Sequence, residues 1–334
     1  MEHQKTLIAA IASHDSVRKN VELSTIIRLL FERDRELLSQ FHFLMTRGTF
    51  NRCVLGKEVG DFQEAGQLTG LESPVREFMI EHTTILPRNR DGGVILLSNL
   101  LVKKRCSILW TFLTPTTTHW MNPELLALIR LGDVWRAKRL LNFGSVEEWF
   151  TREAHRDRNR RLQPIPPEFK LADGTLQKAT LSSSGATKIE FPRDSQSYGR
   201  KTFGEKTIAL IAHDEMKPRM IEFCVDFEFE LARFKRILTT GTTGKRISDA
   251  TSMLKERIVP LNSGPLGGDI EIAVEVLFDQ CDVIIFFVDP LHPHPHTDDI
   301  RVVFAAAMRT PTVRVLANEM QAREWMDRVV RESD

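Results

Sequence analysis

A glycine-rich loop and three further acid or base candidates lie within 37 residues, between Ser263 and Asp299. The loop runs Ser263-Gly264-Pro265-Leu266-Gly267-Gly268-Asp269, and the apolar segment that follows ends at Asp289, ahead of His296 and Asp299. Glycines let a backbone approach a ligand closely, and the outward N–H groups of such a loop attract an anion. We therefore expect an anion-binding loop beside groups that exchange protons.

A second loop of the same character precedes the first. Thr240-Gly241-Thr242-Thr243-Gly244 leaves a predicted strand and enters a predicted helix, whose dipole favours a negative ligand at its start. The threonine hydroxyls and Ser263 add hydrogen-bond donors. Lys217, one turn after His213 and Asp214, adds a positive charge. Together these groups predict a site for a small phosphorylated ligand.

Two of these features also have plainer interpretations. Asp269 lies at a predicted helix start, where aspartate is a favoured N-cap, although its place directly after two glycines favours a catalytic base. His292, His294 and His296 alternate with prolines, and no carboxylate or cysteine near them has a spacing typical of zinc ligands. We expect no metal ion there, and a proton-transfer role for His296 with Asp299.

The elements that position these groups alternate along the chain. Apolar runs predict five strands buried on both faces, at 207–212, 236–239, 258–261, 283–288 and 312–316. Helices are expected near 215–234, 244–256, 269–280, 297–309 and 319–331. This alternation predicts a parallel sheet with helices on both sides. Ligands of such sheets bind beyond the carboxyl ends of the strands, where both loops lie.

The amino-terminal part of the chain repeats this pattern. Asp91-Gly92-Gly93-Val94 echoes Leu266-Gly267-Gly268-Asp269, and from Gly93 to Cys106 and from Gly268 to Cys281 the distance is 13 residues in both cases. A repeat at fixed offsets indicates two copies of one structural unit. Each copy is expected to hold a parallel five-stranded sheet between two layers of helices.

Composition agrees with two globular domains. The 334 residues are divided into a domain at 1–150, a charged and Pro/Ser-rich linker at 151–204 and a domain at 205–334. A net charge of +1 gives no reason to expect nucleic acid or an anionic membrane as a partner. No apolar run has a membrane-spanning length, the amino terminus lacks a signal-peptide pattern, and the four cysteines lack CxxC spacing. We expect a cytoplasmic protein.

Along nearly the whole of 205–330 the motifs resemble those of methylglyoxal synthase. The matching motifs are Ala212-His213-Asp214-x-x-Lys217, Thr240-Gly241-Thr242-Thr243-Gly244, Ser263 through Asp269, Phe286-Phe287-Val288-Asp289-Pro290-Leu291 and His296-x-x-Asp299. The resemblance implies an α/β fold of the flavodoxin-like or Rossmann-like three-layer kind. It also implies elimination of phosphate from dihydroxyacetone phosphate to give methylglyoxal through an enediolate, without metal or organic cofactor.

The resemblance assigns roles to individual residues. Asp269 would be the base and His296 the proton shuttle, with His213 and Asp299 helping to orient the site. Phosphate, which is also a product and a possible inhibitor, would be held by Lys217, Thr240, Thr242, Thr243, Ser263 and the Gly264 amide; Asp214, Gly241 and Asp289 would support them. Methylglyoxal synthases are typically homo-oligomers of single-domain chains, so the resemblance implies a homo-oligomer here too. With two domains in each chain, a trimer could form a ring of six domains.

The first copy departs from the motifs. Val94 stands at the position of Asp269 and Met121 at that of His296, and valine cannot accept a proton. The domain at 1–150 is therefore expected to be degenerate and non-catalytic, retained for structure, assembly or ligand sensing. The alternative for the chain is a phosphate- or nucleotide-binding regulatory module of the same fold without turnover.

Overall fold

The structure is a computed structural model that describes residues 6–12, 17–57, 70–113, 123–152, 169–172, 174, 176–177, 179–191, 201–289, 297–310 and 312–331. The chain divides into two compact units, Met1–Glu190 and Phe191–Asp334. No helix among these residues has both the length and the apolar character that crossing a bilayer requires.

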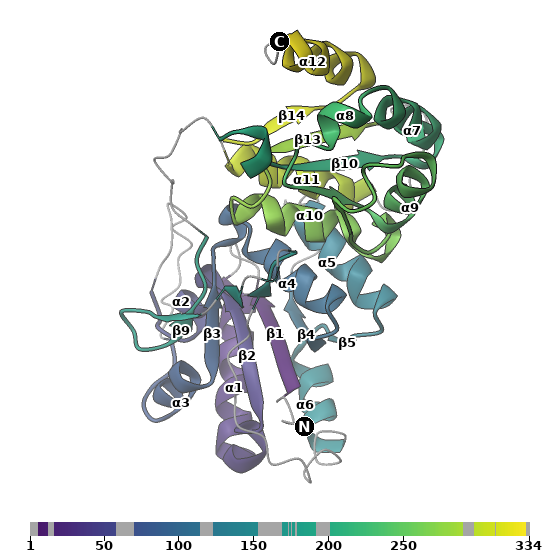
Figure 1. Cartoon of the computed structure of the whole chain (residues 1–334). Coiled ribbons are helices and arrows are strands. Elements are labelled where there is room, and N and C mark those ends of the chain that lie inside the picture. The colour runs from purple at the N-terminus through teal and green to yellow at the C-terminus, as the bar shows by residue number, and fades with distance from the viewer. Residues whose placement is uncertain are drawn as a thin grey trace. The chain divides into compact units, whose positions relative to one another are not determined.

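The second unit is built on a five-stranded parallel sheet with the strand order β12-β11-β10-β13-β14, of which Figure 1 labels β10, β13 and β14. Its strands are β10 (Thr207–Ala212), β11 (Arg236–Thr239), β12 (Ile258–Pro260), β13 (Val283–Phe287) and β14 (Arg314–Leu316). Every residue of β10, β11 and β13 is buried. The predicted doubly covered parallel sheet is thereby confirmed.

Helices cover both faces of this sheet. They are α7 (Lys217–Asp226), α8 (Glu228–Leu231), α9 (Gly241–Ala250), α10 (Gly268–Leu277), α11 (Thr297–Arg309) and α12 (Glu319–Arg331). Alternate strand residues face opposite ways: Phe287 packs in a core with Phe223 of α7, whereas Phe286 stacks on Phe304 of α11. The single helix expected at 215–234 is two helices, because Phe227 leaves the helical conformation at φ −115°, ψ 31°.

The first unit repeats the same core. Its strands β1 (Thr6–Ala12), β2 (Phe41–Thr46), β3 (Thr83–Leu86), β4 (Cys106–Phe112) and β5 (Lys138–Leu140) are parallel in the order β5-β4-β1-β2-β3. The helices are α1 (Val17–Leu38), α2 (Arg47–Cys53), α3 (Val75–Glu81), α4 (Gly93–Val102), α5 (Pro123–Val134) and α6 (Phe143–Arg152). In each unit the strands therefore take the order 3-2-1-4-5, or its reverse read from the other edge, which confirms the tandem repeat.

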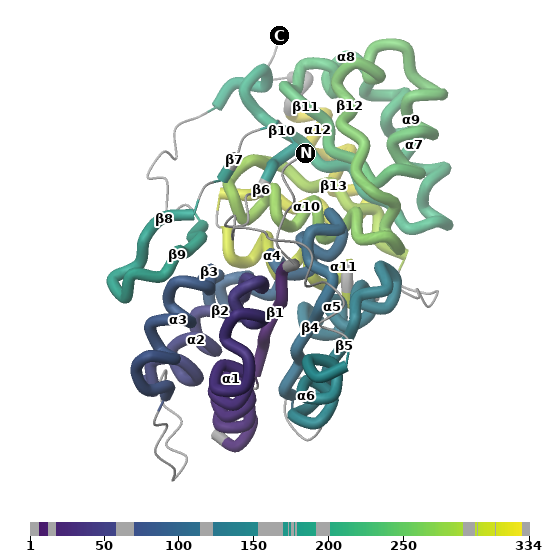
Figure 2. Tube along the Cα trace, turned by 90° about the horizontal axis from the view of Figure 1, so that it is seen from below, coloured from purple at the N-terminus to yellow at the C-terminus, as the bar shows by residue number. Residues whose placement is uncertain are grey.

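The first sheet extends beyond the five predicted strands. β9 (Thr187–Lys188) pairs in parallel with β3, and β8 (Thr180–Leu181) pairs antiparallel with β9, so the sheet has seven strands (Figure 2). β6 (Phe169–Lys170) and β7 (Leu176–Gln177) form a separate antiparallel pair. All four strands come from the segment expected as a linker, and strands of two residues carry no periodicity from which to predict them.

The helices α4 and α10 both begin after a double-glycine turn, and the two turns have the same geometry. Gly92 and Gly267 are left-handed, with φ of 95° and 99°. At Gly93 a Cβ atom would lie 2.0 Å from the Pro87 carbonyl oxygen, and at Gly268 it would lie 1.9 Å from that of Asn262. Both turns exclude side chains, so the fold alone explains these glycines in either unit.

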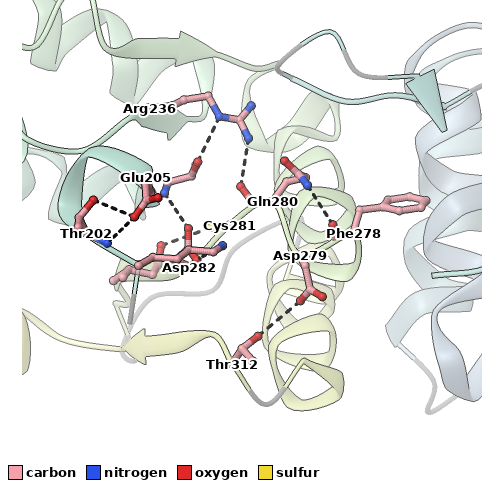
Figure 3. Close-up of polar contacts among 12 residues, drawn as sticks. Thr202, Glu205, Arg236, Phe278, Asp279, Gln280, Cys281, Asp282 and Thr312 are labelled. Carbon is pink, nitrogen blue, oxygen red and sulfur yellow. Dashed lines mark hydrogen bonds and ion pairs between the residues drawn. The ribbon is translucent and has the colours of Figure 1, made fainter. Parts of the chain in front are cut away.

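Polar contacts join the amino ends of neighbouring strands in the second unit (Figure 3). Arg236 donates through Nε to Oγ1 of Thr207 (3.2 Å) and through Nη2 to the carbonyl of Gln280 (3.1 Å), and Nη2 lies 3.5 Å from Oε2 of Glu275. Asp282 accepts from the N–H of Thr207 at 2.8 Å. This buried network lies at the end of the sheet opposite the glycine-rich loops.

Candidate active site

A cavity of about 220 Å³ opens at the carboxyl ends of the strands in the second unit. The connections that follow β10, β11 and β12 line it together with residues of β13 and α11, and most of the predicted site residues lie on these connections. The lining residues are Ile211, Ala212, His213, Asp214, Lys217, Thr240, Thr242, Ser263, Gly264, Pro265, Asp269, Phe286 and Ile300. Strand order reverses between β10 and β13, and open α/β sheets bind their ligands at that point.

Lys217 supplies a buried positive charge to this cavity. Its Nζ donates to Oγ1 of Thr242 at 2.8 Å and also pairs with Asp214. The Lys217 side chain is 8% exposed, whereas that of Asp214 is 81% exposed. Because water screens the exposed carboxylate, this ion pair is weak and the ammonium remains suited to a second anion.

The threonine loop divides into lining and supporting residues. Thr240 and Thr242 line the cavity, while the Thr240 hydroxyl donates to that of buried Thr243 at 3.2 Å. The N–H of Gly241 donates to the carbonyl of Asn262 at 3.1 Å, which ties this loop to the next one. Thr243, expected as a phosphate ligand, is not among the lining residues and instead accepts the hydrogen bond of Thr240. Gly241 links the two loops through its backbone N–H.

His213 lines the cavity, and one of its two ring nitrogens is fixed as a hydrogen-bond acceptor. The backbone N–H of Asp289 donates to Nδ1 of His213 at 2.8 Å, and both residues are buried. A backbone N–H can only donate, so Nδ1 accepts and the ring proton of the neutral imidazole is on Nε2. The ring also packs edge to face against Phe286, with 5.2 Å between the ring centroids. Asp289 supports the site through its backbone.

Asp269 is the second residue of α10 and is 2% exposed. The N-cap of this helix is Gly267, and no side chain makes a capping hydrogen bond there, so the N-cap interpretation of Asp269 is wrong. The carboxyl group lines the cavity instead. At the same position of the first unit, Val94 is fully buried.

The predicted proton-transfer pair is not described. His296 lies outside the described residues, and Asp299 falls in the first turn of α11 with its side chain likewise outside them. Within the described part of the chain, no three His, Cys, Asp or Glu side chains gather as a metal ion would require.

Sequence reasoning missed the apolar part of the lining. Ile211, Phe286 and Ile300 bear no chemical group that marks a site. For Ile211 and Phe286 the signal that was available is position, since both are near the carboxyl ends of neighbouring strands.

In the first unit, the residue at the start of the corresponding loop is held in an ion pair within that unit. Arg47, at the position of Thr240, is paired with the carboxylate of Glu190, and Lys188 donates to the same carboxylate at 2.9 Å. The hydrogen bond from Lys188 and the contacts with Arg47 hold the pKa of Glu190 below its ordinary value. His14 and Asp15, which stand where His213 and Asp214 do, and Met121, at the position of His296, lie outside the described residues.

Comparison with known proteins finds relatives that share one name. No family model matches the chain. Methylglyoxal synthase of Thermus thermophilus is 43% identical over 98 residues, covering 29% of this chain and 75% of that protein. Methylglyoxal synthase of Brevibacillus brevis is 37% identical over 137 residues, covering 38% of this chain and 97% of that protein. The crystal structure of methylglyoxal synthase from Elizabethkingia anophelis has 28% identity and a TM-score of 0.34, and covers 37% of this chain and 78% of that one.

The matched segments amount to 29–38% of this chain but to three quarters or more of those relatives' own sequences. A segment of this chain thus corresponds to most or nearly all of a single-unit relative at 37–43% identity. On that basis, the chain belongs to the methylglyoxal synthase family.

Proposed function

We propose that the second unit is a phosphate-eliminating lyase that converts dihydroxyacetone phosphate to methylglyoxal and phosphate. One observation carries the proposal: a single cavity unites the carboxylate of Asp269, the Nε2–H donor of His213 and the ammonium of Lys217. The name of the relatives, methylglyoxal synthase, supports the same reaction.

The chemistry begins at Asp269. Its carboxylate removes a proton from the hydroxymethyl carbon beside the substrate carbonyl, and the electron pair forms an enediolate; a positioned base of this kind contributes roughly 10²–10⁴ in rate. His213 donates from Nε2 to the developing oxyanion, whose charge a preorganised donor stabilises. The proposal keeps proton transfer between the enediolate oxygens for His296, with Asp299.

Elimination then completes the reaction. The C–O bond to phosphate breaks with its electron pair leaving on the phosphate oxygen, and the remaining enol becomes methylglyoxal as its CH₂ carbon gains a proton and its hydroxyl group loses one. Lys217, Thr240, Thr242, Ser263 and the Gly264 N–H hold the phosphate in this proposal. The ammonium and the loop donors stabilise the charge that the phosphate gains as it leaves.

The test is direct assay of the full chain. With dihydroxyacetone phosphate and a chelator present, we expect methylglyoxal and inorganic phosphate in equal amounts, and Asp269→Asn is expected to abolish both. If folded protein binds phosphate or a nucleotide in calorimetry yet forms neither product, the proposal fails and a binding module without turnover is favoured.

For the first unit we propose no turnover. Val94 has no group that accepts a proton, and Arg47, at the position of Thr240, is paired with Glu190. Its retention for structure is the function these contacts support best.

A further inference from the structure

Asn262 joins the two anion loops to the helix that carries Asp269. Its backbone N–H and its side-chain amide both donate to Oε2 of Glu271, at 2.7 and 3.0 Å. Its carbonyl accepts from the N–H of Gly241 at 3.1 Å. Glu271 lies on α10, two residues after Asp269, and is 4% exposed. One carboxylate oxygen thus connects the residue before Ser263 to the first turn of α10.

The packing around Asn262 leaves little room for movement. Its carbonyl oxygen lies 1.9 Å from where a Cβ of Gly268 would stand, and Cγ2 of Thr240 lies 3.2 Å from the same point. The N–H of Gly268 donates in turn to the carbonyl of Ser263 at 3.0 Å. A shift of the Asn262 peptide therefore moves Ser263 and the start of α10 together, because close-packed interiors transmit displacements.

A buried carboxylate is costly unless donors satisfy it. Glu271 receives two N–H groups at one oxygen, and charge-assisted hydrogen bonds are about twice as strong as neutral ones. The pair therefore holds the loop more firmly than a neutral contact would.

The first unit supplies an internal comparison. At the positions of Asn262 and Glu271 it has Pro87 and Leu96, so the N–H donor and the carboxylate acceptor are both lost. The glycine turn nevertheless keeps its geometry, with Gly93 as close to the Pro87 carbonyl as Gly268 is to that of Asn262. The turn therefore does not require the Asn262–Glu271 pair, which is found in the unit that also has Asp269.

We propose that Glu271 and Asn262 are positioning residues of the active site. Glu271 fixes the Asn262 peptide, and through it holds the phosphate-binding Ser263–Gly264 loop in register with Asp269. The inference rests on the proposed function for its substrate, but its effect on phosphate binding can be measured separately. In this geometry small displacements matter, since a misplacement of about 1 Å can cost roughly 10²-fold in rate.

The test measures phosphate binding and turnover in the full chain with Glu271→Leu. Calorimetry with inorganic phosphate gives both the stoichiometry, which reports the folded fraction, and the Kd, which reports the site. We expect Kd for phosphate and KM for dihydroxyacetone phosphate to rise together by about tenfold or more, because at least one charge-assisted bond is lost. Glu271→Gln, whose amide oxygen still accepts one N–H, is expected to recover part of the loss.

Two further variants keep the test decisive. Asn262→Pro combined with Glu271→Leu installs the pair of the first unit and leaves no donor unsatisfied, so it is expected to fold even if the single variant does not, and to show the same rise in Kd. Glu275→Gln is the matched control, because Glu275 lies on the same helix, is equally buried and pairs with Arg236 at the other end of the sheet. It is expected to lower stability with Kd unchanged.

A phosphate Kd within about twofold of wild type in folded Glu271→Leu or in the double variant would overturn the inference. Absence of methylglyoxal from the wild-type chain would instead overturn the proposed function, and phosphate Kd would still decide the role of Glu271.

Discussion

The backbone N–H of Asp289 donates a 2.8 Å hydrogen bond to Nδ1 of His213. The two residues follow β13 and β10, the neighbouring strands between which the strand order reverses. The bond therefore spans the point where α/β sheets bind ligands, and it fixes both the orientation and the tautomer of the imidazole. In the proposed reaction His213 is therefore a hydrogen-bond donor, and the base is another residue.

His213→Asn distinguishes the acceptor role of Nδ1 from the donor role of Nε2. The shorter amide can still accept from the Asp289 N–H but offers no donor at the Nε2 position. We expect kcat to fall by about 10²-fold, the usual loss for one oxyanion donor, with Tm little changed. His213→Gln places an N–H near Nε2 and is expected to retain more activity than Asn. The reverse ranking, in steady-state assays of both variants, would refute the donor assignment.

Lys217 and Asp214 form an ion pair whose members are predicted to matter unequally. Removing the buried ammonium in Lys217→Met takes a charge-assisted donor from the phosphate, so KM and phosphate Kd are expected to rise by about 10- to 100-fold. Asp214→Asn removes a carboxylate that is mostly in water, and a change of less than about fivefold is expected. Equal effects of the two substitutions on phosphate Kd would show that the pair acts as a unit.

The strands and the cavity were predictable because short, continuous signals specify them. β10 and β11 have the predicted bounds, since strands covered on both faces are unbroken apolar runs. The loops that follow such strands must meet at one edge of the sheet, which brought His213, Lys217, Thr240 and Asp269 to a common cavity. Local sequence and sheet geometry point to the same answer there.

Features that depend on tertiary contacts or on a single backbone conformation were not predictable in the same way. The His213–Asp289 bond joins residues 76 positions apart, and the Glu271–Asn262 contact matches no motif. The break at Phe227 was missed because residues on both sides of it are helical. β9 was missed as a parallel neighbour of β3, because a two-residue strand is defined only by its partner.

Val94→Ala separates stability from activity. Val94 is fully buried in α4 at the position that Asp269 occupies in α10. Truncating it leaves a small cavity, so we expect the free energy of unfolding to fall by about 2 kcal/mol with kcat and KM for dihydroxyacetone phosphate unchanged. Urea denaturation and steady-state assay are the measurements. A loss of kcat in the folded variant would mean that the first unit takes part in turnover.

The contacts of Glu190 lead us to expect that the stability of the first unit depends on pH. Lys188 first, and Arg47 with it, lower the pKa of Glu190 below its ordinary value of 4.5. A carboxylate with a lower pKa in the folded state stabilises that state above its unfolded pKa, and this contribution is lost as pH falls through the folded pKa. Glu190→Gln should therefore be less stable than wild type at pH 7, by at most about 1 kcal/mol for a partly exposed pair.

The difference between wild type and Glu190→Gln should shrink below pH 4.5 and vanish at lower pH. Tryptophan fluorescence during urea unfolding is a suitable probe, because Trp110, Trp120, Trp135 and Trp149 belong to the first unit and only Trp325 to the second. Glu81→Gln, at an exposed position of α3, is the control and should stay parallel to wild type. A difference for Glu190→Gln that is constant from pH 7 to pH 3 would contradict the pairing, since the neutral amide mimics only the protonated acid.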